Sequence, residues 1–334
     1  MARAVIFGCA GTALAERERR FFAEAAPWGF ILFARNVAGP SQLRRLTESL
    51  REAVGRDAPI LIDQEGGRVA RLRGPDWREW APALEACAQL PGRAERARAM
   101  YLRYRLIAGE LAAAGLDVNC APVLDLAGPA THAVIRNRCY GGDPAEVAAI
   151  GRAVADGLLA GGVLPVMKHM PGQGRADLDS HLALPRVEAT GAELAADFAP
   201  FRALADLPMA MTAHLVYAAL DPEAPATQSA RIVGLIRDEI GFDGLLMTDD
   251  LSMKALAGGF GDRAERALRA GCDLVLHCNG DAGEMAAVAA TVPALDGRSL
   301  ARAEAALALR RRPAEDDAGA LAAELAAIGG RADA

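Results

Sequence analysis

The chain has 334 residues, of which 37 are Lys or Arg and 43 are Asp or Glu, so its formal net charge is −6. Hydrophobic residues make up 52% of the sequence and charged residues 24%, which are the proportions of a folded globular protein and not of a disordered one. The acidic balance and the lack of a Lys/Arg cluster in the sequence argue against a nucleic-acid partner, and more weakly against an anionic membrane surface.

The N-terminal residues allow two interpretations. The segment MARAVIFGCAGTALAE has one Arg followed by an uncharged run with an A-x-A-like ending, which loosely resembles a signal peptide. The favoured interpretation is a buried strand over 4–8 followed by a glycine turn, because the same strand–glycine–helix pattern recurs along the chain.

Short apolar runs bounded by Gly, Pro or Asp alternate with Ala-rich helical stretches. We expect strands at 4–8, 29–36, 59–67, 116–126, 163–172, 207–215, 244–252 and 272–279. These runs are apolar almost throughout, as in parallel strands that are buried on both faces. We expect helices at 41–55, 144–159, 191–204 and 229–240, and several of them begin with Pro or Ser. The long gap between the third and fourth strands leaves room for an extra helix or hairpin.

Strand and helix alternation predicts an α/β fold, a single (β/α)₈ TIM-type barrel that forms one catalytic domain over 1–334. C-terminal helices are expected at about 298–330, with one at 301–312 and another at 314–327. A doubly wound open sheet is the structural alternative.

Polar residues follow the apolar runs at the ends where a barrel of this type has its active site. They are Asp63, Gln64, Glu65, Asp125, Lys168, His169, His214, Asp249, Asp250, His277 and Asn279. All five histidines fall at strand ends or in the loops that follow them. Asp125 has an alternative role, which is to orient a neighbouring arginine.

Other polar candidates also have purely structural interpretations. Asp63 and Asp249 could cap strand ends, and Asp250 is expected to be the N-cap of a helix. His214 and His277 could be packing residues with satisfied ring nitrogens, and this interpretation is favoured for His277.

The segment KHMPGQGRADLDSH over 168–181 is a Pro- and Gly-containing loop long enough to fold over a pocket. Asp179 and His181 are separated by one residue, so an extended chain places them on the same side. A carboxylate at hydrogen-bond distance fixes the histidine tautomer and raises its pKa, which would give a proton donor near neutral pH. A solvated Asp–His pair on a surface loop is the alternative.

The cysteines have no C-x-x-C spacing, and we expect them to be reduced core residues of a cytoplasmic protein and not a disulfide framework. They are Cys9, Cys87, Cys120, Cys139, Cys272 and Cys278.

Four motifs occur in order on the predicted rim: IDQEGGRVARL, APVLDL, KHMPGQG…DSH and TDDLSM. With them the chain resembles the NagZ-type β-N-acetylglucosaminidases of glycoside hydrolase family 3, from about Gly8 to Leu276. The resemblance implies that Asp249 is the nucleophile, that His181 is the acid/base and that Asp179 is its partner. It implies the substrate-binding residues Asp63, Arg71, Arg138, Lys168 and His169, the arginine at 138 through IRNRCYG, which resembles the family segment I-G-x-R-S-F-G.

The sequence departs from the family pattern at three positions. The family loop usually reads K-H-F-P-G-H-G, whereas Met170 and Gln173 replace its Phe and second His here, and Gln64 replaces a frequent His. None of these is an assigned catalytic group, but they are expected to alter the packing of the loop or the aglycone site.

The resemblance implies a retaining exo-β-N-acetylglucosaminidase without cofactor or metal. Its substrate would be a small amino-sugar or muropeptide, N-acetylglucosaminyl–1,6-anhydro-N-acetylmuramic acid with or without stem peptide, processed in cytoplasmic peptidoglycan recycling. We expect no membrane or nucleic-acid partner, and a monomer.

Three other functions remain open at this point. A metal-dependent barrel hydrolase could use His169, His181, His214 and Asp249, but no H-x-H or H-E-x-x-H spacing supports it. A phosphorylase would use phosphate in place of water, since a deprotonated His repels phosphate less than a carboxylate does. The presence of Asp249, Asp179 and His181 argues against a catalytically dead sugar-binding barrel.

Overall fold

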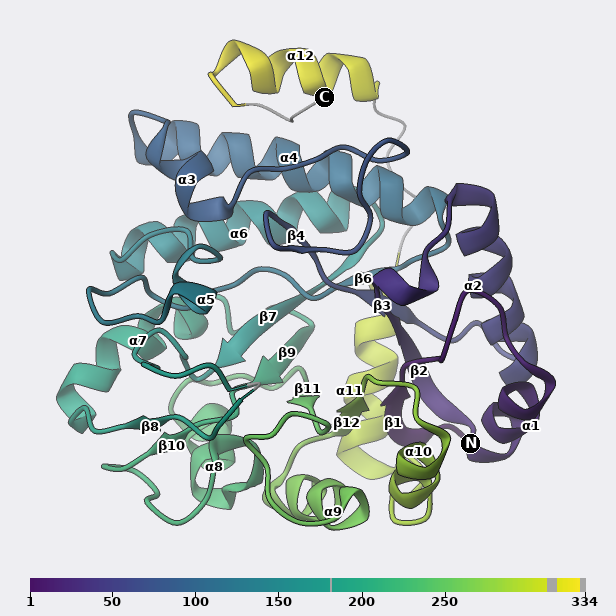
Figure 1. Ribbon diagram of the computed structural model, residues 1–334. Coiled ribbons are helices and arrows are strands. Elements are labelled where there is room, and N and C mark those ends of the chain that lie inside the picture. The colour runs from purple at the N-terminus through teal and green to yellow at the C-terminus, as the bar shows by residue number, and fades with distance from the viewer. Residues whose placement is uncertain (181, 311–316, 331–334) are drawn as a thin grey trace.

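The computed structural model describes residues 1–180, 182–310 and 317–330. Parallel strands close into a barrel, and helices surround it (Figure 1). In chain order the barrel strands are β1 (Arg3–Phe7), β2 (Pro27–Leu32), β3 (Ile60–Ile62), β6 (Val118–Asn119), β7 (Leu164–Met170), β9 (Met209–Thr212), β11 (Leu245–Asp250) and β12 (Leu274–His277). Each overlaps one of the predicted runs. The TIM-type barrel is therefore confirmed, and the open-sheet alternative is wrong.

The first and last strands close the barrel. β1 pairs with β2 on one side and with β12 on the other, with Val5 opposite Val275 and Phe7 opposite His277. The N-terminal run thus forms a buried barrel strand, as favoured. Because all the strands are parallel, their carboxyl ends meet at one rim, where the site of such a barrel lies.

The predicted strand at 59–67 divides at Asp63. After β3 the chain leaves the barrel, and β4 (Gln64–Gly66) pairs antiparallel with β5 (Val69–Ala70). Gly67 and Arg68 form the turn, and Gly66 at the end of β4 and Gly67 have φ values of +102° and +57°, a backbone conformation that favours glycine. The run is therefore one strand followed by a hairpin, not one long strand.

The predicted strand at 116–126 is also shorter than expected, since only β6 pairs regularly. An isolated bridge between Val123 and Lys168 continues the contact with β7. In both runs the polar residues near the carboxyl end, Asp63 and Asp125, lie beyond the regularly paired strand residues.

Helices cover the outside of the barrel. They are α1 (Glu16–Ala25), α2 (Pro40–Val54), α3 (Ala83–Ala88), α4 (Arg93–Ala113), α5 (Ala133–Arg136), α6 (Pro144–Ala160), α7 (Gly191–Ala203), α8 (Ala230–Asp238), α9 (Phe260–Ala270), α10 (Ala282–Ala289), α11 (Gly297–Ala308) and α12 (Ala318–Ala327). Short elements complete the fold: the 3₁₀ helices η1 (Ala34–Asn36) and η2 (Ala226–Gln228), and the paired strands β8 (Arg186–Val187) and β10 (Val216–Tyr217).

The predicted helices correspond to α2, α6, α7 and α8, and their starts follow the sequence signals. Pro144 is the first residue of α6, where the Asp143 carboxylate accepts a hydrogen bond from the backbone N–H of Glu146 at 2.7 Å. Ser229 caps α8 in the same way by accepting from the backbone N–H of Ile232 at 3.1 Å. Such caps satisfy N–H groups that have no partner within the helix.

Additional elements fill the long connection between β3 and β6, as the sequence suggested: the β4–β5 hairpin and the helices α3 and α4. α4 packs along α6, and α12 lies on the outer side of α4 (Figure 1). α11 and α12 occupy the expected C-terminal region, although residues 311–316 of that stretch lie outside the described residues.

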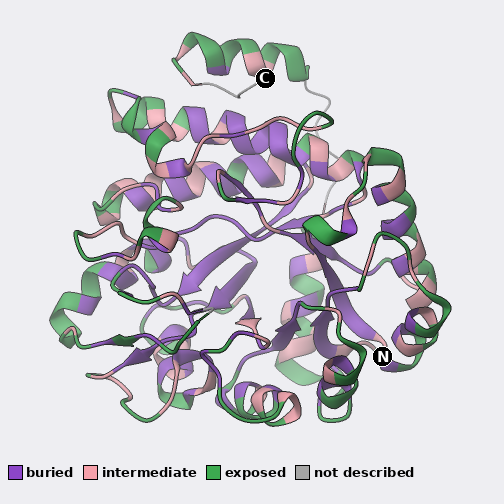
Figure 2. Cartoon of the chain, in the orientation of Figure 1, coloured by how far each residue is buried: buried purple, intermediate pink, exposed green. Residues whose placement is uncertain are grey.

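Apolar side chains form two layers, because successive residues of a strand point to opposite faces. Ile6, Leu61 and Val166 belong to the cluster inside the barrel. Val5 and Phe7 belong to the cluster between the strands and the helices. The strands are therefore buried on both faces (Figure 2), which explains their nearly continuous apolar sequences.

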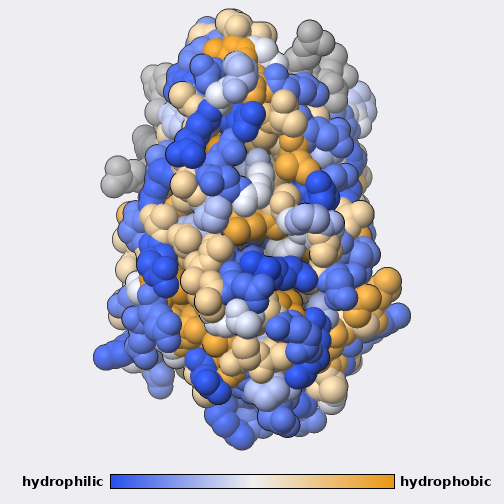
Figure 3. All heavy atoms as spheres, turned by 90° about the vertical axis from the view of Figure 1, so that its left-hand side faces the viewer, coloured by the Kyte–Doolittle hydropathy of each residue, from blue (hydrophilic) through white to orange (hydrophobic). Residues whose placement is uncertain are grey.

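All six cysteines are buried and free, as predicted. Much of the surface drawn in Figure 3 is hydrophilic, with smaller hydrophobic areas between the polar residues. Within the described part of the chain, no helix is both long enough and apolar enough to span a membrane.

Candidate active site

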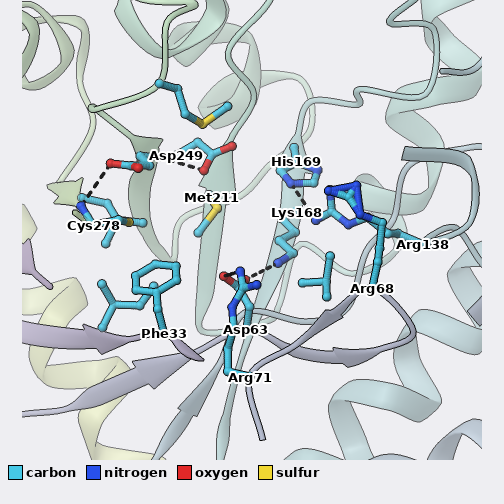
Figure 4. A pocket seen from close by; sticks show the side chains of 15 residues that line it. Phe33, Asp63, Arg68, Arg71, Arg138, Lys168, His169, Met211, Asp249 and Cys278 are labelled. Carbon is cyan, nitrogen blue, oxygen red and sulfur yellow. Dashed lines mark hydrogen bonds and ion pairs between the residues drawn. The ribbon is translucent and has the colours of Figure 1, made fainter. Parts of the chain in front are cut away.

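A pocket with a volume of about 180 Å³ opens at the carboxyl ends of the barrel strands (Figure 4). It contains predicted site residues that come from five different segments of the chain. These are Asp63, Arg71, Arg138, Lys168, His169 and Asp249. The remaining lining residues among those described are Ile31, Phe33, Arg68, Val69, Met211, Asp250, Met253, Leu276 and Cys278. Folding thus brings most of the predicted polar residues into one small, polar pocket.

Asp63 is held between two cations. Its Oδ1 accepts a hydrogen bond from Lys168 Nζ at 2.7 Å, and its Oδ2 accepts one from Arg71 Nη2 at 3.0 Å. The Arg71 guanidinium also lies over the ring of Phe33, with 5.2 Å between Cζ and the ring centroid. Asp63 follows β3 and Arg71 follows β5, so the hairpin is what brings this pair together. Both side chains point into the pocket in Figure 4.

Glu65 is a functional candidate to which the sequence analysis gave no role. It lies 2.7 Å from Lys168 Nζ and accepts two hydrogen bonds from Arg138, at 2.8 Å and 2.9 Å. The Glu65 side chain is only 3% exposed, so its carboxylate supports the cations from behind and does not line the pocket. Its spacing of two residues from Asp63 was an available signal, because alternate residues of an extended chain share a face.

His169 is oriented by a carboxylate and an arginine. Its Nδ1 lies 2.6 Å from Asp125 Oδ2, and its Nε2 lies 3.3 Å from Arg138 Nη2. Since the arginine can only donate, Nε2 accepts and Nδ1 carries the proton that Asp125 accepts. Asp125 therefore orients a histidine directly, and its predicted alternative role of orienting an arginine is wrong.

Lys168 and His169 both contribute to the site although they are neighbours in β7. Adjacent residues of a regular strand point to opposite faces. The pairing of β7 with β9 shifts register between Met167 and Met170, so this end of the strand is irregular and both side chains reach the rim. The peptide bond between Lys168 and His169 is cis.

Positive and negative side chains alternate in this set of contacts. The neighbouring charges determine whether each carboxyl and amino group is ionised. Burial alone would raise the pKa of Asp63, but Lys168 and Arg71 outweigh that effect and bring the pKa well below its usual range. Burial likewise opposes ionisation of Glu65, yet its cationic neighbours lower the pKa to about 2. Burial would lower the pKa of Lys168, but the two carboxylates raise it. The pocket therefore presents fixed charges at neutral pH, and these favour hydrogen bonding to hydroxyl groups.

Asp249 approaches the pocket from β11, on the other side from Asp63 (Figure 4). One of its carboxylate oxygens accepts a hydrogen bond from the backbone N–H of Asp250 at 2.8 Å. Asp250 is not the helix N-cap that was predicted, because the next helix starts only at Phe260. Its carboxylate instead accepts from the backbone N–H groups of Ser252 at 2.9 Å and Cys278 at 3.1 Å, which fixes the turn after β11.

His214 and His277 are fully buried packing residues. His214 Nδ1 lies 2.7 Å from Thr227 Oγ1, its Nε2 lies 3.1 Å from the carbonyl oxygen of Asp250, and burial lowers its pKa. His277 Nε2 lies 3.0 Å from a Glu284 oxygen. The interpretation as packing residues with satisfied ring nitrogens is confirmed for His214. His277 is buried as expected, but its Nδ1 has no hydrogen-bond partner among the described residues, so the expectation of satisfied ring nitrogens is wrong there.

The loop after β7 is anchored at its start. Asp125 Oδ1 accepts a hydrogen bond from the backbone N–H of Gln173 at 2.6 Å, and Gln173 Nε2 lies 3.2 Å from Ser180 Oγ. The next functional candidate, Asp179, is partly exposed and is not among the described residues that line the pocket. His181 lies outside the described residues.

The described ranges, 1–180, 182–310 and 317–330, contain no group of three or more His, Cys, Asp or Glu side chains arranged to hold a metal ion. The ring nitrogens of His214 and Nδ1 of His169 are already engaged by protein groups.

Comparisons with known proteins agree with this geometry. The family described as "Glycosyl hydrolase family 3 N terminal domain" matches residues 11–311. A Beta-hexosaminidase of Alkalilimnicola ehrlichii is 41% identical over 281 residues, which span 82% of this chain and 80% of that protein. A Beta-hexosaminidase of Pseudomonas aeruginosa is 38% identical over 284 residues, which span 84% of this chain and 83% of that protein.

Among solved structures, NagZ from Neisseria gonorrhoeae in complex with N-trifluoroacetyl-D-glucosamine is similar to this chain, with a TM-score of 0.85 and 32% identity. The alignment covers 98% of each chain. The barrel fold and the polar pocket at its rim are consistent with membership of the same family as these relatives. The chain belongs to glycosyl hydrolase family 3 and is a glycoside hydrolase.

Proposed function

We propose that the chain is a retaining exo-β-N-acetylglucosaminidase. Asp249 would be its nucleophile, His181 its acid/base and Asp179 the partner of His181. The observation that carries the proposal is the position of Asp249. Its carboxylate lines the same small pocket as Lys168 and His169, so a sugar held by those groups has a carboxylate beside it. The relatives named Beta-hexosaminidase and the NagZ complex with an N-acylated glucosamine support the choice of sugar.

The first chemical step forms a glycosyl-enzyme. An Asp249 oxygen attacks the anomeric carbon while the bond from that carbon to the leaving oxygen breaks, and His181 gives its proton to that oxygen. In the second step water attacks the anomeric carbon, its proton passes to His181, and the ester bond to Asp249 breaks. Two displacements restore the β configuration, so the sugar is released with retention.

The fixed charges around the pocket hold the sugar. Asp63 accepts hydrogen bonds from sugar hydroxyls, and Lys168 and Arg138 donate to hydroxyl oxygens. Charge-assisted hydrogen bonds are shorter and stronger than neutral ones, so this set both binds and orients the ring. Arg71 and His169 complete the set. Ordering the ring next to the nucleophile lowers the entropic part of the barrier.

Substrate and location follow from the same family resemblance. The natural substrate would be N-acetylglucosaminyl–1,6-anhydro-N-acetylmuramic acid, with or without stem peptide, in cytoplasmic peptidoglycan recycling. Small muropeptides are the partners that this role requires, and the enzyme would act as a monomer without cofactor or metal.

An assay with 4-nitrophenyl N-acetyl-β-glucosaminide tests the proposal. We expect wild-type protein to release nitrophenol and β-N-acetylglucosamine in phosphate buffer, and full activity after exhaustive chelation. Asp249→Ala should be folded and should lose kcat by about 10⁴-fold or more. Wild-type-like turnover by Asp249→Ala would refute the assignment of the nucleophile. Release of the 1-phosphate would instead show a phosphorylase, and loss of activity on chelation would show metal dependence.

A further inference from the structure

Arg68 is a cation at the pocket that has no side-chain partner among residues 1–180, 182–310 and 317–330. The described lining residues include four cations, of which Arg71 and Lys168 pair with Asp63, and Arg138 pairs with Glu65. Arg68 is exposed, and its guanidinium forms no hydrogen bond or ion pair with any described residue. The other three cations are therefore already neutralised by carboxylates, whereas Arg68 offers an uncompensated positive charge.

The β4–β5 hairpin fixes the place of Arg68. Gly67 donates its backbone N–H to the carbonyl oxygen of Trp80 at 2.7 Å. Arg73 Nη2 donates to the carbonyl oxygens of Gly67 at 2.8 Å and of Arg68 at 3.4 Å. The backbone beneath Arg68 is thus held from two sides, and only its side chain is free to follow a ligand. Figure 4 shows this side chain on the same side of the pocket as Arg138.

Pocket size indicates which part of a substrate Arg68 would meet. At about 180 Å³ the pocket is below the roughly 300–1,000 Å³ typical of drug-sized ligands, so it suits one sugar and not two. A sugar beside Asp63 and Asp249 fills it. The aglycone on the β-face of that sugar must then lie at the rim, where the exposed Arg68 guanidinium is.

We propose that Arg68 binds a carboxylate on the aglycone and makes the enzyme selective for glycosides with an acidic leaving portion. A guanidinium binds a carboxylate through two parallel N–H···O bonds, which a neutral aglycone cannot accept in the same geometry. This inference rests on the proposed glycosidase function and adds to it the residue that selects the aglycone. The lactyl group of a muramic acid without stem peptide carries such a carboxylate, whereas a stem peptide would be joined there through an amide bond.

The test compares two substrates that differ in one charge: N-acetylglucosaminyl–1,6-anhydro-N-acetylmuramic acid and its lactyl methyl ester. We expect wild-type protein to prefer the acid, mainly through a lower KM. In Arg68→Gln the ratio of kcat/KM for acid over ester should fall by about fivefold, as for an exposed ion pair. Arg68→Lys should restore part of that ratio, because it keeps the charge but loses the planar fork.

Arg45→Gln is the matched control, since Arg45 is exposed on α2, away from the pocket residues, and the same charge is removed. It should leave both kcat/KM values unchanged. Raising the salt concentration should lower the wild-type preference for the acid toward that of Arg68→Gln, because screening weakens an exposed ion pair.

Failure of this inference is distinguishable from failure of the glycosidase proposal. If 4-nitrophenyl N-acetyl-β-glucosaminide is cleaved but the acid-over-ester ratio is the same in wild type and Arg68→Gln, the role of Arg68 is wrong while the activity stands. Cleavage of the aryl glycoside but of neither disaccharide contradicts the proposed aglycone class. Cleavage of none of the three contradicts the glycosidase proposal itself.

Discussion

Lys168 Nζ lies 2.7 Å from Asp63 Oδ1, and the Lys168 side chain is only 2% exposed. Glu65 approaches the same ammonium group at 2.7 Å, so one buried cation is shared by two carboxylates. A buried charge that loses its partner cannot regain the solvation that it would have in water. This makes the pair a stability element as well as part of the candidate site.

The variant Lys168→Met should therefore be strongly destabilised. It leaves the buried Glu65 and the partly buried Asp63 without their shared cation, and the free energy of unfolding should fall by on the order of 3–5 kcal/mol. Urea unfolding measures this. Lys254→Met is the control, because Lys254 is the other lysine of the chain and is exposed. Its effect should stay within about 0.5 kcal/mol, and an equally small effect of Lys168→Met would show that the buried ion pairs contribute little.

Acid should destabilise the protein through the same carboxylates. The pKa of Asp63 is lowered below its usual range and that of Glu65 to about 2, so both bind fewer protons in the folded state than in the unfolded state. Their contribution is complete above the ordinary carboxylate pKa of about 4 and is lost as the pH falls toward 2.

A series of urea titrations from neutral pH down to about pH 2.5 tests that dependence. Glu65→Gln should be less stable than wild type at neutral pH, and the difference should shrink on acidification, because the wild type loses what the variant already lacks. A difference that stays constant over the whole range would contradict the lowered pKa.

Asp125→Asn should impair binding without unfolding the protein. Asp125 accepts the Nδ1 proton of His169 and so leaves Nε2 free to accept from Arg138. An amide can present its own N–H to Nδ1 and favour the other tautomer, so kcat/KM should fall by on the order of tenfold.

Asp273→Asn is the comparison for Asp125→Asn. Asp273 is as buried and is paired with Arg237 and Arg302, at the opposite end of the barrel. It should lower stability and leave kcat/KM of the folded protein unchanged. Equal kcat/KM values for Asp125→Asn and wild type would show that the orientation of His169 is unimportant.

The assignment of His181 as acid/base predicts a dependence on the leaving group. His181→Ala should slow substrates with poor, unactivated leaving groups by at least about 10²-fold, whereas aryl glycosides with activated leaving groups should lose much less. Rates for a series of aryl N-acetyl-β-glucosaminides of rising phenol pKa measure this. Equal losses across the series would count against the role.

Sequence patterns were sufficient for the barrel because parallel strands buried on both faces are apolar throughout, and this signal does not depend on distant contacts. They also located Asp63, Lys168 and Asp249, since strand ends in such a barrel share a rim. Where the chain leaves the sheet was harder to predict. The hairpin after Asp63 depends on a glycine turn, and without that turn the position of Arg68 cannot be predicted.

The sequence also did not show which side chains would contact each other. That Asp125 binds His169 and not an arginine depends on how β6 and β7 lie beside each other. Asp250 precedes a turn and not a helix, which its local sequence does not distinguish. When several groups could serve as the partner of a side chain, the tertiary structure determines which of them it contacts.

Trapping the glycosyl-enzyme tests the central claim most directly. Protein treated with 5-fluoro-N-acetyl-β-glucosaminyl fluoride, which slows the second displacement more than the first, should gain the mass of one sugar. After proteolysis that mass should be found on the peptide that contains Asp249, and Asp249→Ala should gain none. A sugar on another residue, or turnover with no adduct and with inversion of the released sugar, would contradict nucleophilic catalysis by Asp249.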